Sequence, residues 1–397
     1  MKHSVIESFE NLKSYCENQN YQGWDPYDGL NSKIFKATPL KHSAFARLAW
    51  IQLFKRNPVN LRKLFRVPKG HNPKAIGLFL TGYCNLYWLA EKKDTRFGTQ
   101  DEIKNKIRYL ADLLIELKTD GYSGACWGYN FDWQARGGLY FPTFTPTVVA
   151  TTYAVNGLLD ANQILKDPKI QETTISSAEF VMQDLNRTQK EEGFLFSYAP
   201  KFGNNTVYNA SLLGSRLLSR IYAITQKKEY AEAARQSVIA CCNNQNDDGS
   251  WYYGELDIQQ WIDSFHTGFN LEAIYEYQRF TDDESFQTAF EKGFEYYVTN
   301  FFLEDGTPKY YHNQTYPIDI HCPAQFITTL SKTNRFQDHQ ALAKKVMDWT
   351  ITNMQDEKGY FYYQKKKSHT NKLSYMRWSQ AWMFCALSYL LLDLQSK

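Results

Sequence analysis

Apolar positions recur every three or four residues in several segments of this chain, with charged residues between them. Ala231, Ala234 and Val238 show this spacing in one such segment. A stripe of this kind predicts an amphipathic helix with one buried face. Segments of this type cover residues 101–118, 173–189, 228–245, 284–303 and 337–355.

A second type of segment is apolar or small on nearly every side, which predicts a helix that is buried all round. These segments cover residues 145–162, 208–224, 267–279, 323–332 and 379–394. They alternate with the amphipathic segments, so the pattern predicts repeated hairpins of one outer and one inner helix. Three upstream segments, residues 4–16, 42–55 and 73–89, bring the expected total to six or seven pairs.

A regularly spaced glycine follows each amphipathic segment. Gly193, Gly249, Gly306 and Gly359 are separated by 56, 57 and 53 residues, and Gly121 precedes them by 72. Glycine adopts the left-handed conformation at low cost, so it is typical of the residue just after a helix. An aromatic residue follows most of these glycines, which predicts a short aromatic loop between the outer and the inner helix.

We expect an all-α fold, an (α/α)6-type toroid of helical hairpins with short, aromatic, β-like loops. An open superhelix is the alternative, but inner helices that are apolar all round favour a closed ring. No Pro-, Gly- or Ser-rich linker divides the chain. We therefore expect one domain over residues 1–397, in which residues 1–70 supply helices that complete the ring and residues 71–397 form the repeated hairpins.

Composition narrows the class of protein further. A formal net charge of +3 does not indicate a nucleic-acid partner. No run of about 18 apolar residues predicts a membrane span, and the N-terminus does not resemble a signal peptide. Seven scattered cysteines are typical of reduced thiols, so we expect a cytoplasmic protein. The oligomeric state stays open.

Aromatic residues make up 16% of the chain, more than a helical core requires, and they gather in the loops. The loops before the inner helices also carry carboxylates, imidazoles, amides and a guanidinium group. In a toroid these loops meet at one central opening, and their chemistry suits a sugar. The candidate substrate-binding residues are His71, Asp132, Trp133, Tyr208, Asn209, Trp261, Arg377, Trp378 and Gln380.

Two pairs of an acid and a base stand out as candidate catalytic residues. Asp263 lies three positions before His266, and Asp319 lies two positions before His321. A helix N-cap explains either aspartate alone, since its carboxylate bonds free backbone amides. The neighbouring histidines make acid–base catalysis the second interpretation.

Arg377 comes just before a buried helix and therefore needs an anionic partner. An internal carboxylate, Asp263 or Asp319, is one possibility, and the carboxylate of an acidic sugar is the other. The alternative interpretation of His71 is a hydrogen-bonding loop residue, and that of the tryptophans is packing.

From about Pro73 onward, the order of outer helix, glycine–aromatic loop and inner helix resembles the six-hairpin toroid superfamily of glycoside hydrolases, polysaccharide lyases and sugar epimerases. The stretches His71 to Lys74, Asp132-Trp133, Asp319 to His321 and Arg377-Trp378 resemble VpsJ-type proteins of bacterial exopolysaccharide biosynthesis. We expect a glycan or sugar as substrate, an acidic one if Arg377 binds its carboxylate, and no cofactor or metal.

Three reactions stay open under this resemblance. Hydrolysis needs two carboxyl groups at a set separation, whereas a lyase or epimerase needs a base next to a neutralised carboxylate. A glycan-binding or scaffold protein without catalysis is a further alternative.

Two other classes of toroid fit less well. The segment from Gln245 to Trp251 matches a repeat of terpene cyclases, but the Asp-x-Asp-Asp motif of those enzymes is absent and Asp282-Asp283-Glu284 lacks the final metal-binding Asp. Cys126-Trp127-Gly128 matches one zinc motif of lanthionine cyclases, but the second motif is missing, which leaves fewer than three ligands.

Overall fold

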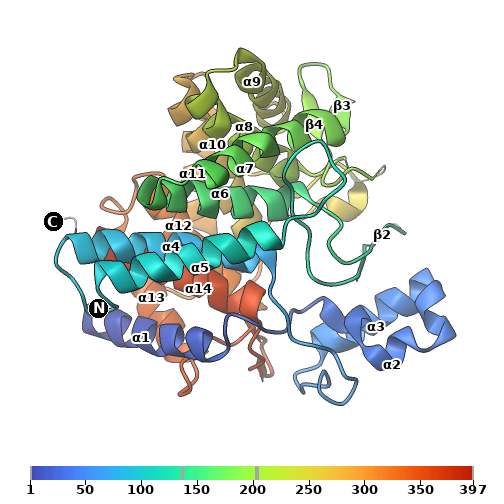
Figure 1. The fold of residues 1–397 in the computed structure, drawn as a ribbon, viewed down its shortest axis with the longest axis vertical. Coiled ribbons are helices and arrows are strands. Elements are labelled where there is room, and N and C mark those ends of the chain that lie inside the picture. The colour runs from blue at the N-terminus through green and yellow to red at the C-terminus, as the bar shows by residue number, and fades with distance from the viewer. Residues whose placement is uncertain (1, 136–137, 202–204, 396–397) are drawn as a thin grey trace.

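The computed structural model describes residues 2–135, 138–201 and 205–395. In this part of the chain six inner helices form a closed ring, because each contacts the next and the last contacts the first (Figure 1). The inner helices are α4 (Pro73–Glu91), α6 (Val148–Leu165), α8 (Tyr208–Thr225), α10 (Ser264–Thr281), α12 (His321–Lys332) and α14 (Ala381–Asp393). The predicted all-α toroid is confirmed.

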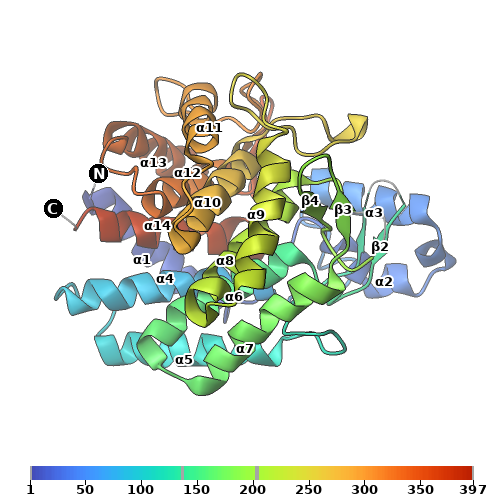
Figure 2. The ribbon, with the colours of Figure 1, turned by 90° about the horizontal axis from the view of Figure 1, so that it is seen from above.

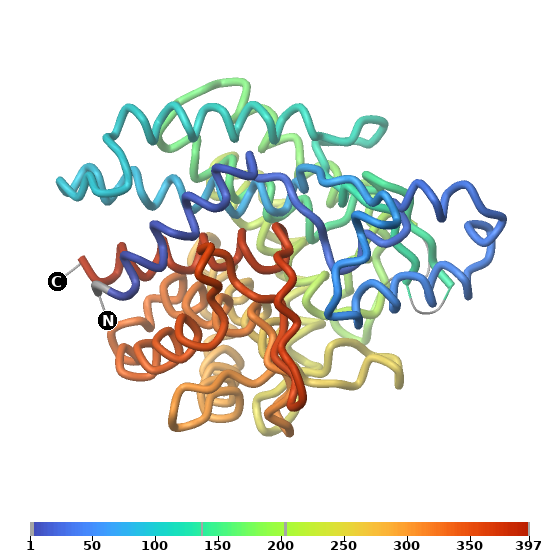
Figure 3. The backbone as a smooth tube through the Cα atoms, turned by 90° about the horizontal axis from the view of Figure 1, so that it is seen from below, coloured from blue at the N-terminus to red at the C-terminus, as the bar shows by residue number. Residues whose placement is uncertain are grey.

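Six outer helices surround this ring, as the view from above shows (Figure 2). They are α1 (Lys2–Asn18), α5 (Gln100–Glu116), α7 (Pro168–Glu179), α9 (Lys228–Cys242), α11 (Gln287–Asn300) and α13 (Gln340–Met354). The described residues thus form six hairpins. The N-terminal helix α1 packs against α13 and α14, so the two ends of the chain close the ring side by side (Figure 3).

The two types of helix differ in burial as their sequences predict. Nearly every residue of α6 and α14 is buried, whereas α5 buries one stripe that includes Ile103, Ile107 and Leu114. A capping box of Thr99 and Glu102 begins α5. The packing between α4 and α6 is close enough that a Cβ on Gly77 would lie 2.3 Å from the Tyr153 carbonyl oxygen.

Residues 19–72 do not belong to the ring, which corrects the expectation that residues 42–55 add to the repeated hairpins. They form η1 (Asp28–Asn31), α2 (Lys33–Lys36), η2 (Pro39–His42) and α3 (Ala44–Arg56), which project beside the toroid (Figures 1 and 3). Leu30, Phe35 and Ile51 form a small core of their own there. The helix predicted over residues 42–55 is present as α3, but it packs on η1 and β1 instead of on the helices of a neighbouring hairpin.

Short antiparallel strands shape the loops before the inner helices. They are β1 (Trp133–Gln134) with β2 (Tyr140–Phe141), β3 (Arg187–Gln189) with β4 (Phe194–Phe196), and β5 (Ile318–Asp319) with β6 (Gln364–Lys365) and β7 (Thr370–Asn371). In the last sheet Asp319 pairs with Gln364. This register joins the loops of two neighbouring hairpins and fixes Asp319 at the start of α12. Three short helical turns complete the described elements: η3 (Phe180–Asp184), η4 (Asp257–Gln259) and η5 (Met376–Gln380).

The glycine repeat ties each outer helix to the next. The Gln245 side chain donates to the carbonyl oxygens of Gly249, at 2.8 Å, and of Ala289 in α11, at 2.9 Å. The Gln355 side chain makes the same bonds to Gly359 and to Ser8 in α1. The repeat therefore continues across the junction between the C-terminal and N-terminal helices.

We predict that Gly249→Ala lowers the free energy of unfolding by more than Gly121→Ala does. Both glycines have φ of +90°, so alanine costs each of them about 1 kcal/mol of backbone strain. A Cβ at Gly249 would also lie 2.4 Å from the Lys292 carbonyl oxygen, whereas nothing lies within 4 Å at Gly121. Urea unfolding of both variants measures the difference. Equal losses would contradict the close contact between repeats.

Candidate functional site

The N-terminal ends of α10, α12 and η5 bring two histidines and several aromatic rings together. The Phe265 ring centroid lies 4.3 Å from that of His266 and 4.4 Å from that of His321. Trp378 contacts both Phe265 and His321, at centroid distances of 5.8 and 5.2 Å. Residues 55 positions apart in the sequence thus share one site, because equivalent positions of successive hairpins face the same opening.

Asp263 orients His266. One carboxylate oxygen of Asp263 caps α10 by accepting from the His266 amide at 3.0 Å, and the other lies 2.7 Å from His266 Nδ1. Trp261 Nε1 donates to this second oxygen at 2.9 Å. Since a carboxylate only accepts, Nδ1 carries a proton, and Nε2 is the ring nitrogen that remains to bond a ligand. About a fifth of the His266 side chain is exposed, and no hydrogen bond to Nε2 is present among the described residues.

Asp319 is held by three donors from three segments. Oδ1 accepts from the His321 amide at 3.0 Å and from Trp378 Nε1 at 2.8 Å, and Oδ2 accepts from Gln364 at 3.2 Å. Complete burial raises the pKa of Asp319 to about 6 against the effect of these bonds. The carboxylate holds Trp378 and the start of α12 in position, and these bonds leave it little freedom to act in catalysis.

His321 is fully buried among rings and has unused hydrogen-bonding capacity. Its ring lies parallel to Phe265, with an interplanar angle of 4°, and 4.2 Å from the Trp382 centroid. Neither Nδ1 nor Nε2 has a hydrogen-bond partner among the described residues. Burial, followed by the nearby charges of Lys74, His266 and Arg377, holds the pKa of His321 well below its usual value. The imidazole is therefore neutral at pH 7, with one donor and one acceptor.

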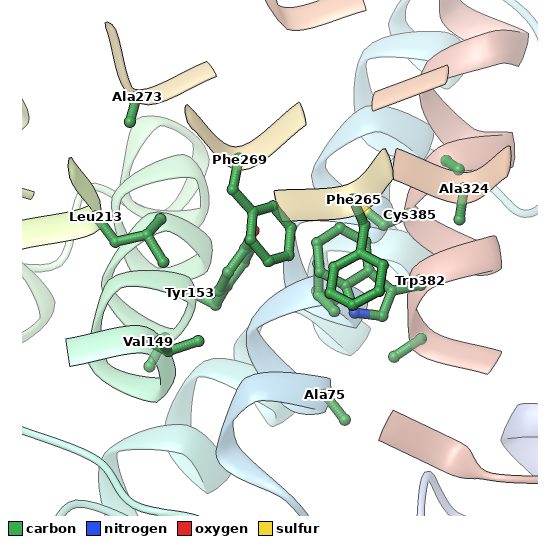
Figure 4. Close-up of a cluster of buried hydrophobic side chains, with 14 of the residues drawn as sticks. Ala75, Val149, Tyr153, Leu213, Phe265, Phe269, Ala273, Ala324, Trp382 and Cys385 are labelled. Atoms are coloured by element: carbon green, nitrogen blue, oxygen red, sulfur yellow. The ribbon is translucent and has the colours of Figure 1, made fainter. Parts of the chain in front are cut away.

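Lys74 joins this group, although it was not among the residues predicted from the sequence. Its ammonium lies 4.4 Å from the Tyr153 ring centroid and 5.1 Å from those of Phe269 and Trp382. Burial lowers the pKa of Lys74 well below its usual value. Figure 4 shows these rings inside the toroid, with Phe269 facing Tyr153 at a centroid distance of 5.8 Å. The sequence feature that could have identified Lys74 is its position at the start of an inner helix.

Other polar atoms inside the ring also lack partners in the described structure. They are Tyr153 OH, Asn270 Oδ1, Gln325 Oε1 and Trp382 Nε1. Buried polar groups are nearly always hydrogen-bonded, so such a concentration points to a place where water or hydroxyl-rich ligands bind. Rings and unsatisfied polar groups together suit a sugar.

Arg377 has an internal partner, but not the one expected. Its Nε and a terminal nitrogen donate to the two oxygens of Asp25 at 2.5 and 2.8 Å, and both side chains are buried. Pairing with Asp263 or Asp319 was therefore wrong, because residues 19–31 bring Asp25 over the end of η5. The pair joins positions 352 residues apart, and the bidentate fork that would hold a sugar carboxylate is already occupied.

The segment that carries Asp25 covers part of the opening. Tyr27 lies 5.7 Å from the Trp378 ring centroid and 6.5 Å from that of Trp133. A cavity of about 10 Å³ remains between Asp25, Asn72, Asn130 and Arg377, which is about the minimum for one water molecule. A sugar cannot occupy this cavity as the chain stands.

The residues predicted on the preceding loop lie at the edge of this group. Asp132 accepts from the amide and hydroxyl of Thr143 and pairs with Lys36 at 3.0 Å. These partners lower the pKa of Asp132 against the effect of burial. Trp133 stacks on Phe141 at 5.1 Å. Asp132 thus anchors the projecting segment to the loop.

Four further residues that were predicted to bind substrate are buried or bond other parts of the protein. Tyr208 and Asn209 are buried at the start of α8. His71 Nε2 lies 2.8 Å from the Asn20 carbonyl oxygen, as a loop hydrogen-bonder would. Gln380 is fully buried and bonds both backbone groups of Phe361, which corrects its assignment to substrate binding because its amide is already used.

In the part of the chain that the structure describes, no three His, Cys, Asp or Glu side chains gather closely enough to hold a metal ion. No helix there is long and apolar enough to cross a membrane.

No protein-family model and no curated protein matches the sequence. Solved structures share the fold at low identity. A sugar epimerase from a ruminal bacterium is 13% identical, with a TM-score of 0.62 over 82% of this chain and 88% of that one. A heparin-specific unsaturated glucuronyl hydrolase is 11% identical, with a TM-score of 0.61 over 100% and 99% of the two chains. A polysaccharide lyase is also 11% identical, with a TM-score of 0.60 over 99% and 98%.

The chain therefore has the six-hairpin toroid fold of carbohydrate epimerases, glycoside hydrolases and polysaccharide lyases. Because these proteins carry out three different reactions on one architecture, the fold does not select the reaction.

We predict that Arg377→Met lowers the free energy of unfolding by about 3–5 kcal/mol, because it leaves the Asp25 carboxylate buried without a partner. Asp25→Asn should also destabilise the protein, and the double variant should lose less than the two single variants together. Chemical denaturation of the four proteins measures this cycle. Additive losses would show that the pair does not support the fold.

We also predict that the stability of Asp319→Asn depends less on pH than that of the parent. Folding raises the pKa of Asp319 from 3.8 to about 6, so the folded parent binds this proton more tightly than the unfolded chain. The parent therefore loses up to about 3 kcal/mol as the pH rises from about 4 to above 6, and the variant lacks this loss. Urea unfolding across this range measures the difference between the two proteins. Parallel pH profiles would show that Asp319 does not titrate in this range.

Proposed function

We propose that this chain is a sugar-modifying enzyme that moves a proton at a carbon next to a carbonyl or carboxyl group of a glycan, with His266 as the acid–base residue. The carrying observation is the Asp263–His266 pair, in which Nδ1 is held at 2.7 Å and Nε2 is free at a partly exposed position. An imidazole oriented by a buried carboxylate is a common general base.

The hydrogen bonds of the two carboxylates favour proton transfer over hydrolysis. A glycosidase needs one carboxyl group to protonate the leaving oxygen and a second to attack or activate water. Here Asp263 caps α10 and orients His266, and Asp319 accepts three bonds in a fully buried position. By contrast, neither nitrogen of His321 has a partner among the described residues, and no hydrogen bond to His266 Nε2 is present there.

In the proposed step His266 Nε2 takes a proton from the carbon, and the electron pair moves onto the neighbouring carbonyl oxygen. An epimerase returns a proton to the opposite face of the carbon from water, and the hydroxide that is left takes the proton from His266, which restores the free imidazole. In a lyase the electron pair instead expels the oxygen substituent on the next carbon. Trp261, which stacks on Tyr253 at 4.5 Å, and Trp378 offer faces for the sugar ring.

The substrate class and setting belong to the same proposal. The resemblance to VpsJ-type proteins supports a role in the biosynthesis or modification of a bacterial polysaccharide in the cytoplasm. An acidic sugar would need Arg377 to exchange Asp25 for the substrate carboxylate. A neutral sugar needs no such exchange, so the Asp25–Arg377 pair favours a neutral ring in the geometry described.

A glycan-binding protein without catalysis is the second candidate. The unpaired groups inside the ring and the exposed face of His266 would serve binding equally well. The same experiment separates the two candidates, because binding without turnover leaves every carbon–hydrogen bond of the sugar unchanged.

We predict that the chain exchanges the proton at C2 of a reducing sugar for deuterium in D₂O, followed by NMR on a panel of neutral hexoses, N-acylhexosamines, disaccharides and uronates. His266→Gln should slow this exchange about 100-fold or more, because it removes the base. Asp263→Asn should also slow it, because Nδ1 loses the acceptor that fixes the ring.

His369→Gln serves as the matched control, since His369 is exposed and its side chain bonds the neighbouring Ser368. Cleavage of an oligosaccharide by addition of water, without C2 exchange, would replace the proposal with a hydrolase. Binding of a sugar with no change in any bond would replace it with the glycan-binding candidate.

A further inference from the structure

Charge is distributed very unevenly between the toroid and the segment that projects from it. Residues 32–70, here called the basic arm, contain ten of the 45 lysines and arginines and none of the 42 aspartates and glutamates. The remainder of the chain therefore carries 35 basic against 42 acidic residues. The small net charge of +3 conceals a strongly positive arm on an acidic body.

Only part of this charge is used inside the molecule. Arg62 pairs with Asp28 at 2.7 Å, and Lys36 pairs with Asp132 at 3.0 Å. Lys33, Lys41 and Lys63 are exposed and form no ion pair with the described residues. The exposed arginines Arg56 and Arg66 likewise have no acidic partner there. The arm thus exposes several positively charged side chains to the solvent.

The same arm exposes large apolar side chains. Six of the fifteen exposed large apolar residues of the described chain lie in these 39 positions: Ile34, Leu40, Phe45, Leu53, Val59 and Leu64. Phe45 is 83% exposed and Leu53 is 42% exposed, and their spacing of eight places them on one face of α3. The opposite side of this helix buries Ile51 and Phe54.

We propose that the basic arm binds the surface of a membrane that contains anionic lipids. Apolar side chains that enter the headgroup region, flanked by lysines that pair with lipid phosphates, are the features that hold amphipathic segments at a bilayer surface. Figure 1 shows α2 and α3 projecting from the ring, where a flat surface can reach them.

Charge and apolar exposure together argue against the other occupants. A second copy docking arm to arm would bring ten positive charges against ten, with no acidic residue in either arm. Nucleic acid or a soluble polyanion would neutralise the lysines but would leave Phe45 and Leu53 in water. An anionic bilayer satisfies both kinds of side chain.

The proposal is tested by flotation of the full-length chain with phosphatidylcholine vesicles, prepared with and without phosphatidylglycerol. We expect binding only to the anionic vesicles and release by high salt. Reversal of three arm charges, Lys33→Glu, Lys41→Glu and Lys63→Glu, should weaken binding about tenfold or more. The matched control reverses three exposed lysines of the toroid, Lys169→Glu, Lys228→Glu and Lys358→Glu, and should bind nearly as the parent does.

A second variant, Phe45→Ser with Leu53→Ser, keeps the charge and removes two apolar contacts, and it should also weaken binding. Circular dichroism verifies that each variant is folded. Equal binding of both triple variants, or no preference for anionic vesicles, would overturn the proposal. Full binding by the serine variant, with competition by heparin, would identify a site for soluble polyanions instead. Dimers that the serine variant abolishes would identify a second copy as the occupant.

Discussion

All six inner helices begin at the same end of the toroid, and their first backbone amides need acceptors in a buried setting. This need for hydrogen-bond acceptors influences which residues surround the site. Four of the six helices meet it with a side chain that precedes the helix and accepts from its amides: Asn72 before α4, Thr147 before α6, Asp263 before α10 and Asp319 before α12. Polar residues at these four positions are therefore explained by capping alone, because an unsatisfied amide there would cost more than a typical hydrogen bond contributes.

Capping and chemistry use the same atoms at two of these positions. Asp263 has two carboxylate oxygens, and the helix amide requires only one of them. The second oxygen orients His266, which converts a structural residue into part of a candidate catalytic pair. Asp319 differs, because the remaining hydrogen bonds to its carboxylate come from the side chains of Trp378 and Gln364. The capping interpretation is thus confirmed for both aspartates, while acid–base catalysis by Asp263 and His266 stays a prediction and Asp319 is mainly structural in its contacts.

Local features of the sequence were sufficient to predict the architecture. The apolar period identified outer and inner helices, and the spacing of Gly193, Gly249, Gly306 and Gly359 gave the repeat, since all four have the positive φ that favours glycine. The meeting of His266 and His321 followed from the same repeat. Each of these predictions depends on residues within one hairpin and on the assumption that hairpins stack in register.

The partners of buried charges could not be predicted in this way. Asp25 and Arg377 are 352 positions apart, and Asp25 lies in a segment outside the repeat. Lys74 is the fourth residue of a stretch that the sequence analysis had noted, but its three aromatic neighbours come from α6, α10 and α14. Such contacts depend on how the ring closes, and a single sequence carries no period that reveals it.

The segment between α1 and α4 has two parts that differ in charge and in burial. Its first part, through Asp25 and Tyr27, adds a negative charge and an aromatic ring to a buried site, where Arg377 would otherwise lack a counterion. Its second part carries no negative charge at all and exposes apolar side chains to solvent. The change from one character to the other falls at Asp28, whose pairing with Arg62 folds the arm back onto the covering segment. Because this ion pair is buried, separating the arm from the covering segment would leave both charges buried without a partner, which makes the contact between the two parts costly to break.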